Sequence, residues 1–186
     1  MSESKAGIII LGIVAIASLG LSGYMFLTNE IFVSPDNQNI VVGMWDNLDE
    51  NMDFADYNET NKFLIELKDQ KIINNNYISI SNANTTIWLL KPGLYKISCI
   101  IDLTNLGDTD LYRGQIIEDS TIYEDVFYFF HPASPTSDFY QVITTFYILT
   151  DGTHLYRFKI YSPDDTDFGI SDSVSYNQFI IEYVRY

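Results

Sequence analysis

The sequence predicts an all-β sandwich or barrel of about ten strands, preceded by one N-terminal transmembrane α-helix. Three observations lead to this prediction. Residues 7–28 carry no charge and are mostly apolar. From Phe63 onward, short apolar runs are separated by turn-forming residues about every ten positions. Tyrosine (14 residues) and phenylalanine (12 residues) are frequent, and aromatic residues favour strands.

The apolar N-terminal stretch has the length of a membrane-spanning helix. About 20 apolar residues cross a hydrocarbon layer of about 30 Å, and residues 7–28 meet that length. Lys5 precedes the stretch, whereas only acidic charges follow it before Lys62. Because positive charge stays inside, residues 1–6 are predicted as a cytoplasmic tail. Residues 29–39 would then be a linker, and residues 40–186 an extracellular domain.

A retained signal-anchor is the preferred interpretation of this stretch, and three others stay open. A secretory signal would be cleaved near Ser18–Gly20 or Leu21–Gly23, where small residues lie. A buried core helix is a further alternative. Finally, Lys5–Gly7 followed by Ile8–Ile10 resembles the short charged leader, cut after glycine, of archaeal pilins and archaellins. That resemblance implies a filament-core helix.

Small residues lie on one side of the predicted membrane helix. Ala15, Ser18 and Ser22 are spaced i, i+3 and i+7. Small side chains let two helices approach closely within a bilayer. We therefore expect this helix to contact lipid and to pack against other copies of itself.

The charge balance excludes one class of function, and the cysteine count excludes an internal disulfide. With 25 acidic and 10 basic residues, the formal net charge is −15, so the surface repels nucleic acid. Nucleic-acid binding is therefore excluded. Cys99 is the only cysteine, so the domain has no internal disulfide. Its place on the apolar side of a predicted strand indicates a small buried hydrophobic residue.

The strands are predicted from alternation and turn signals. They cover residues 40–45, 63–68, 77–81, 87–90, 95–104, 111–118, 122–130, 139–150, 154–161, 168–170 and 179–186. Residues 46–61 show no period and are predicted as a loop. In the clearest strand, alternate residues are apolar, a period of two that a helix cannot satisfy. These residues are Tyr95, Ile97, Cys99, Ile101 and Leu103. Asp151–Gly152 predicts a hairpin between the strands on either side.

Three segments resemble the tumour necrosis factor and complement globular-head superfamily. Asn84–Ser98 is similar to the family's apolar strand followed by Pro-Gly-x-Tyr, here Pro92–Tyr95. Leu149–Tyr156 is similar to its hairpin before a late strand, and Tyr176–Ile181 to its aromatic closing strand. The resemblance implies a ten-stranded jelly roll and a homotrimer with aromatic side chains at the interface. The last strand lacks the family's glycine, so ligand and receptor specificity do not follow.

Signatures of catalysis are scarce. The two histidines, His131 beside prolines and His154 after a turn, have no metal-ligand spacing, and we predict both as solvated loop residues. No Gly-x-Ser-x-Gly, phosphate-binding loop or dinucleotide-binding motif occurs. The chain is therefore predicted not to be an enzyme. An exterior enzyme would need a cleft of converging acids or histidines.

Two acidic turns carry candidate calcium ligands, because hard cations favour clustered carboxylate oxygens. These residues are Asp108, Asp110, Asp164, Asp165 and Asp167. Solvated acidic turns are the alternative interpretation, and no other cofactor is predicted. Two sequons, at Asn58 and Asn84, are candidate glycosylation sites in an extracellular domain.

These observations together predict a membrane-anchored cell-surface protein that acts by binding or assembly. Its jelly-roll head lies outside the cell and is expected to form a trimer. Its partners would be membrane lipid, other copies of the chain, and a surface protein or glycan. The alternative is a structural filament subunit, with the N-terminal helix in the fibre core or with donor-strand exchange.

Overall fold

The computed structural model describes most of the region after the predicted linker. The described residues are 39–51, 62–119, 121–132, 140–164, 167–171 and 177–185. The predicted membrane helix with Ala15, Ser18 and Ser22 lies outside them, as do Asn58 and Asp165. In the described ranges, no helix has the length and apolar character needed to span a bilayer. Residues 39–185 form one compact unit.

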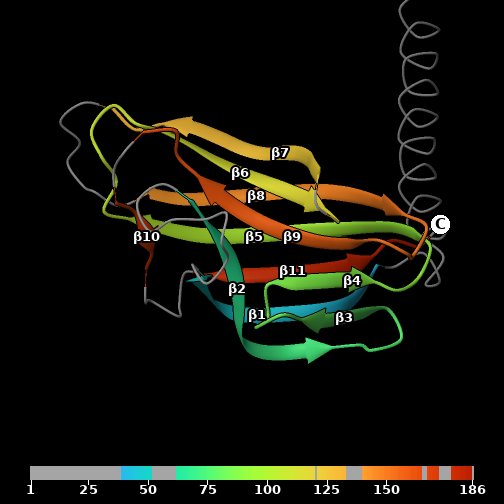
Figure 1. Cartoon of the computed structure of the whole chain (residues 1–186). Helices are drawn as coiled ribbons and strands as arrows, with labels where there is room; N and C mark the ends of the chain where they lie inside the picture. The colour runs from blue at the N-terminus through green and yellow to red at the C-terminus, as the bar shows by residue number, and fades with distance from the viewer. Residues whose placement is uncertain are drawn as a thin grey trace, which may run out of the picture. The chain divides into compact units, whose positions relative to one another are not determined.

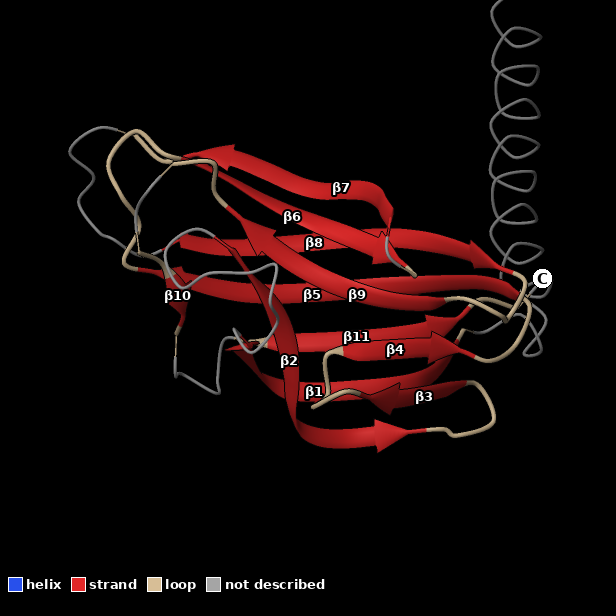
Figure 2. Cartoon of the chain, viewed as in Figure 1, coloured by secondary structure: helices blue, strands red, loops and turns tan. Residues whose placement is uncertain are grey.

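Every regular element in these described ranges is a β-strand (Figure 2). The strands are β1 (Ile40–Asn51), β2 (Lys62–Ile73), β3 (Ile78–Ser81), β4 (Thr86–Leu89), β5 (Gly93–Thr104), β6 (Leu111–Glu118), β7 (Thr121–Phe130), β8 (Tyr140–Thr150), β9 (Leu155–Tyr161), β10 (Gly169–Ile170) and β11 (Gln178–Tyr183). Neighbouring strands pair antiparallel. The all-β prediction is confirmed for this part of the chain.

The strands form two layers that share β2 (Figure 1). The first layer, here called the β5 sheet, has the order β8–β5–β11–β1–β2, with β10 added at the end of β5. The second layer, the β9 sheet, contains β7–β6–β9–β4–β3. The first residues of β2, Lys62–Leu64, pair with β9, and the rest of β2 pairs with β1. Thus β2 closes one side of the sandwich.

The sandwich has two distinct ends. At one end β1 begins beside the end of β11, where Ile40 pairs with Tyr183. We call it the entry end, because the chain enters the domain there. At the other end β5 finishes and β6 begins, and residues 105–110, 162–164 and 167–168 lie there, outside the strands. We call it the loop end.

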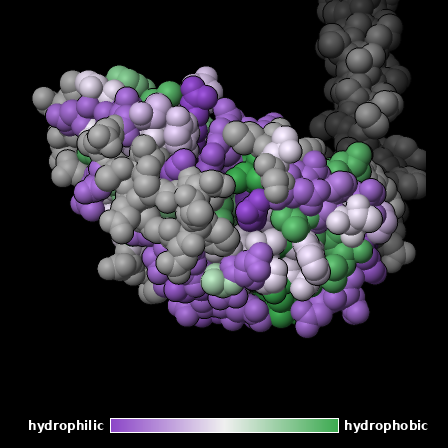
Figure 3. Space-filling view, viewed as in Figure 1, coloured by the Kyte–Doolittle hydropathy of each residue, from purple (hydrophilic) through white to green (hydrophobic). Residues whose placement is uncertain are grey.

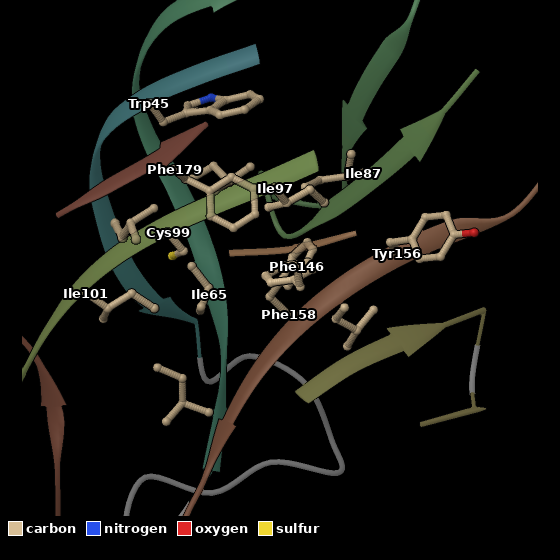
Figure 4. Close-up of a cluster of buried hydrophobic side chains, with 14 of the residues drawn as sticks. Trp45, Ile65, Ile87, Ile97, Cys99, Ile101, Phe146, Tyr156, Phe158 and Phe179 are labelled. Carbon is tan, nitrogen blue, oxygen red and sulfur yellow. The ribbon is translucent and has the colours of Figure 1, made fainter. Parts of the chain in front are cut away.

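The core lies between the sheets and is centred on β5. The five alternate residues from Tyr95 to Leu103 are all buried, as predicted. Aromatic rings pack across the two sheets at Phe158 on β9 (Figure 4). The centre of its ring lies 5.5 Å from that of Phe146 on β8 and 4.9 Å from that of Phe179 on β11. Each buried aromatic side chain contributes about 2–3 kcal/mol of hydrophobic free energy. The core therefore needs no disulfide.

Tyr95 and Cys99 are two core side chains that carry a titratable group. The hydroxyl of Tyr95 donates to the Tyr77 carbonyl at 3.1 Å and accepts the Lys91 N–H at 3.3 Å. Burial raises the pKa of Tyr95 to about 12. Burial also raises the pKa of the Cys99 thiol, so Cys99 stays protonated. The prediction that Cys99 is a small buried hydrophobic residue is confirmed.

The predicted hairpin at Asp151–Gly152 is wrong. The strand before it, β8, pairs with β5, whereas β9 pairs with β2, β4 and β6. The turn therefore carries the chain from one sheet to the other. Gly152 has φ of 90°, and a Cβ there would lie 3.0 Å from the Leu90 carbonyl oxygen. The alternation of apolar and polar residues predicts that a segment is a strand. It does not predict which strand pairs with it, because that depends on how the two sheets pack around the core.

The strand β1 is longer than predicted, because residues 46–51 continue it instead of forming a loop. Its pairings shift register near Val41 and Met44, and such bulges interrupt the period of two. Acidic residues that face solvent also make this segment look like a loop in the sequence. One of them, Asp49, has its Oδ2 3.4 Å from Lys68 Nζ on β2, which is an ion pair between neighbouring strands. Alternation alone therefore could not locate the end of β1.

We expect Gly152→Ala to destabilise the domain by about 1–2 kcal/mol, because φ is positive and the new methyl group would press on the Leu90 backbone. Urea denaturation measures the change. Ala83→Gly is the matched control, since Ala83 also has a positive φ of 51°. That variant should be neutral or more stable. Equal loss in both variants would contradict the explanation.

Candidate functional site

Exposed apolar side chains gather along β7 and β8. Tyr128 on β7 is 76% exposed and Ile143 on β8 is 71% exposed, and both Phe130 and Tyr147 are also exposed. In the described pairings, β7 has β6 on one side and β8 has β5 on one side, with no strand on the other. We call these two strands the open edge. An apolar sheet edge of this kind favours contact with another protein surface.

The open edge continues onto the solvent side of the β5 sheet, which we call the outer face. Across β8, β5 and β11, Tyr147 is followed by Lys96 and then by Glu182. Lys96 Nζ lies 2.6 Å from Glu182 Oε2. This hydrogen bond raises the pKa of Lys96. The outer face is therefore apolar near β8 and carries a satisfied ion pair in its middle.

The two strands of the open edge are held together by side chains. The Thr144 hydroxyl donates to the Val126 carbonyl at 3.1 Å. The rings of Phe129 and Tyr140 stack with centroids 4.2 Å apart. Beside Val126 and Thr144 lies a small cavity of about 10 Å³, lined mainly by apolar side chains that include Phe127. That volume is about one water molecule.

Four of the acidic residues predicted as calcium ligands, Asp108, Asp110, Asp164 and Asp167, lie at the loop end. Asp164 Oδ2 accepts the Leu111 N–H at 2.9 Å, which holds Asp164 close to the start of β6. The Tyr112 hydroxyl faces Asp110 Oδ2 at 3.5 Å. In the described ranges, no three His, Cys, Asp or Glu side chains are grouped to hold a metal ion. Asp165 is not described, so calcium binding by the set remains a prediction.

His131 is buried, so its prediction as a solvated loop residue is wrong. Its ring Nδ1 lies 3.0 Å from the Gly107 carbonyl oxygen, and its backbone N–H donates to the Asp110 carbonyl at 2.8 Å. These bonds fix residues 105–110 to the end of β7. A buried polar side chain needs such partners, and no pattern around His131 reveals them.

His154 lies at the entry end, partly exposed, and joins two turns. Its Nδ1 is 2.8 Å from Asp119 Oδ2, and its Nε2 is 3.8 Å from Asp151 Oδ1. The hydrogen bond to Asp119 raises the pKa of His154, and the nearby Glu118 and Asp151 carboxylates add to this. The two histidines lie at opposite ends of the sandwich. The structure therefore does not bring them together for catalysis or metal binding.

The sequon at Asn84 lies in a turn on the surface. Residues Asn82–Asn84 all have positive φ, between 51° and 62°, and Asn84 is exposed. The Thr85 hydroxyl donates to the Asn82 carbonyl at 2.6 Å, and Asn82 Nδ2 donates to the buried Thr86 hydroxyl at 3.3 Å. Glycosylation of Asn84 remains a prediction.

The order of the two sheets defines a jelly-roll sandwich of the tumour necrosis factor type, which confirms the predicted resemblance at the level of fold. A crystal structure of murine APRIL at pH 8.0, a protein of that family, has a TM-score of 0.51 at 7% identity, covering 79% of this chain and 100% of that chain.

Two further crystal structures of murine APRIL match with lower scores. At pH 8.5 the TM-score is 0.47 with 8% identity, covering 78% of this chain and 95% of that chain. At pH 5.0 the TM-score is 0.46 with 9% identity, covering 79% of this chain and 100% of that chain. No family model and no curated protein sequence matches.

We expect the pKa of His154 to lie above its usual value of 6.5, because Asp119 stabilises the charged ring. The raised pKa means that this stabilisation is complete below about pH 6.5 and is lost as the pH rises through the folded-state pKa. An NMR titration of the folded protein measures the pKa of His154. Asp119→Asn should lower the pKa more than Asp151→Asn, whose carboxylate is farther away. The reverse order would contradict the assignment.

Proposed function

We propose that this chain is a membrane-anchored cell-surface protein that acts by binding, with an extracellular jelly-roll head that forms a homotrimer. The exposed apolar surface of the open edge and the outer face is the observation that carries this proposal. The fold itself permits many functions, so the argument depends on this surface and on the N-terminal sequence.

The membrane anchor is supported by residues 7–28. Their length, the absence of charge and the preceding Lys5 favour a helix that enters the membrane with residues 1–6 inside. The head then lies outside the cell. The strongly acidic composition suits an exterior protein that must stay soluble at a crowded surface.

Self-association is supported by the side chains that a single head leaves in water. Tyr128 and Phe130 lie on β7, at the edge of the β9 sheet, and Ile143 and Tyr147 lie on β8, at the edge of the β5 sheet. Covering them with a second copy would remove apolar area from water. Covering the Lys96–Glu182 pair costs less than covering a lone charge, because each charge already has its partner at 2.6 Å. The threefold arrangement is what the resemblance to the tumour necrosis factor family implies.

The partner of the head would be a surface protein or a glycan. In this proposal the loop end points away from the membrane, since the anchor precedes Ile40 at the entry end. Calcium at Asp108, Asp110, Asp164, Asp165 and Asp167, and glycans at Asn58 and Asn84, belong to the same proposal. Each would change the charge or shape of the exposed head.

We expect Ile143→Asp to convert the trimer of the head, residues 39–186, into monomers, because it places a charge in the apolar interface. Sedimentation velocity measures the mass. Trp88→Ser is the control, since Trp88 is exposed on the β9 sheet, away from the outer face. It should remain trimeric. A wild-type head that is monomeric at all concentrations would contradict the assembly.

Mass spectrometry of the mature N-terminus separates the anchor from its alternatives. We expect an intact start at Met1 or Ser2, because a retained anchor keeps residues 1–6. A start at Ile8 would indicate a filament subunit, and a start near Tyr24 would indicate secretion.

A further inference from the structure

The entry end carries exposed apolar side chains from both sheets. Leu149, near the end of β8, is 70% exposed and pairs with Leu94 on β5. Leu90 follows β4 and is also exposed, as is Trp88 beside Leu155 at the start of β9. On the side shown in Figure 3, hydrophobic residues gather mainly over the half that contains β3, β4 and the start of β9.

Aromatic rings and cations surround these apolar side chains. Lys91 Nζ lies 4.1 Å from the centre of the Tyr77 ring, which is 5.0 Å from the ring of Tyr183. The Tyr183 hydroxyl donates to the Pro92 carbonyl at 3.0 Å. Exposed Arg185 follows two residues later. Tyrosine, tryptophan and basic residues beside leucine are typical of surfaces that rest at a bilayer interface.

The acids of the entry end are engaged with neighbours. Glu182 pairs with Lys96, Asp119 pairs with His154, and Glu118 accepts the Tyr156 hydroxyl at 2.8 Å. Asp151 accepts the backbone N–H and the hydroxyl of Thr153. The loop end, in contrast, carries the acids Asp108, Asp110, Asp164 and Asp167. At the entry end, Lys96 offsets the charge of Glu182, and Lys91 and Arg185 add two further positive charges, which lowers the repulsion from an anionic lipid surface there.

The length of the linker keeps the entry end close to the bilayer. Eleven residues, 29–39, separate the apolar stretch from Ile40. Eleven residues span at most about 40 Å when fully extended. The root-mean-square end-to-end distance of a random coil of that length is about half of this. Ile40 lies beside Tyr183 at the entry end. This step rests on the proposed membrane anchor.

We propose that the entry end docks on the membrane that holds the chain. Leu90, Leu149 and Trp88 enter the interfacial layer of the lipid, where their apolar surface leaves water. Lys91 and Arg185 lie against lipid phosphates. The head is thereby held in one orientation, with the acidic loop end facing outward.

The full chain in vesicles of phosphatidylcholine and phosphatidylglycerol tests this docking. A fluorophore is attached at Leu149→Cys, or at Thr109→Cys on the loop end as the control, since Thr109 is exposed and lies outside the proposed trimer interface. Buried Cys99 should stay unlabelled. A quencher carried on the lipid chains should reduce the fluorescence of the Leu149 probe by about twofold and leave the fluorescence of the Thr109 probe unchanged.

A charge variant makes the test sharper. Lys91→Glu in the Leu149→Cys background should weaken the quenching, and more so in vesicles with more phosphatidylglycerol. Lys62→Glu, at the loop end, is the matched control and should leave it unchanged. An equal effect of both variants would overturn the assignment of Lys91.

The possible outcomes separate the docking from the anchor. A chain that floats with the vesicles but shows no lipid quenching at Leu149 keeps the anchor and overturns the docking. A Leu149 probe shielded from water only at high protein concentration, without lipid quenching, shows that a second copy covers the entry end, which also overturns it. A chain that does not float overturns the proposed anchor itself.

Discussion

The register of β5 is the constraint on which the rest of the structure depends. Its odd-numbered residues from Tyr95 to Leu103 fill the core, and its even-numbered residues, such as Lys96 and Ser98, form the middle of the outer face. A shift by one residue would exchange the two sets. Long ladders on both sides, to β8 and to β11, prevent that shift. The core and the proposed contact surface are thus fixed by one strand.

This arrangement divides the head into regions with separate roles in the proposed function. On the closed side, the first residues of β2 pair with β9 and its later residues pair with β1, so β2 joins the two sheets. The open edge and the outer face carry the apolar surface for assembly. The entry end carries the proposed docking surface, and the loop end collects carboxylates such as Asp108 and Asp164. Leu149 on β8 belongs to both the open edge and the entry end, so assembly and docking meet at that residue.

The sequence predicted the strands of this fold better than their partners. Alternation in β5 and the turn at Lys91–Gly93 are local signals, and both appear in the structure. The partners of β8 and β9 depend on how the whole core closes, so the hairpin prediction at Asp151–Gly152 was wrong. The buried place of His131 is equally a tertiary fact. The open edge was not predicted, since exposed and buried aromatic residues look alike until strands have neighbours.

The antiparallel pairing of β1 with β11 and β2 has a mechanical consequence. In the proposed function, the head is held at Ile40 and pulled at its loop end, so the force acts along its strands. The hydrogen bonds that flank β1 then lie across the direction of pull and share the force, so they must break together and not one after another. Such a sandwich resists traction better than its thermodynamic stability alone implies, and single-molecule stretching between those two points measures that resistance.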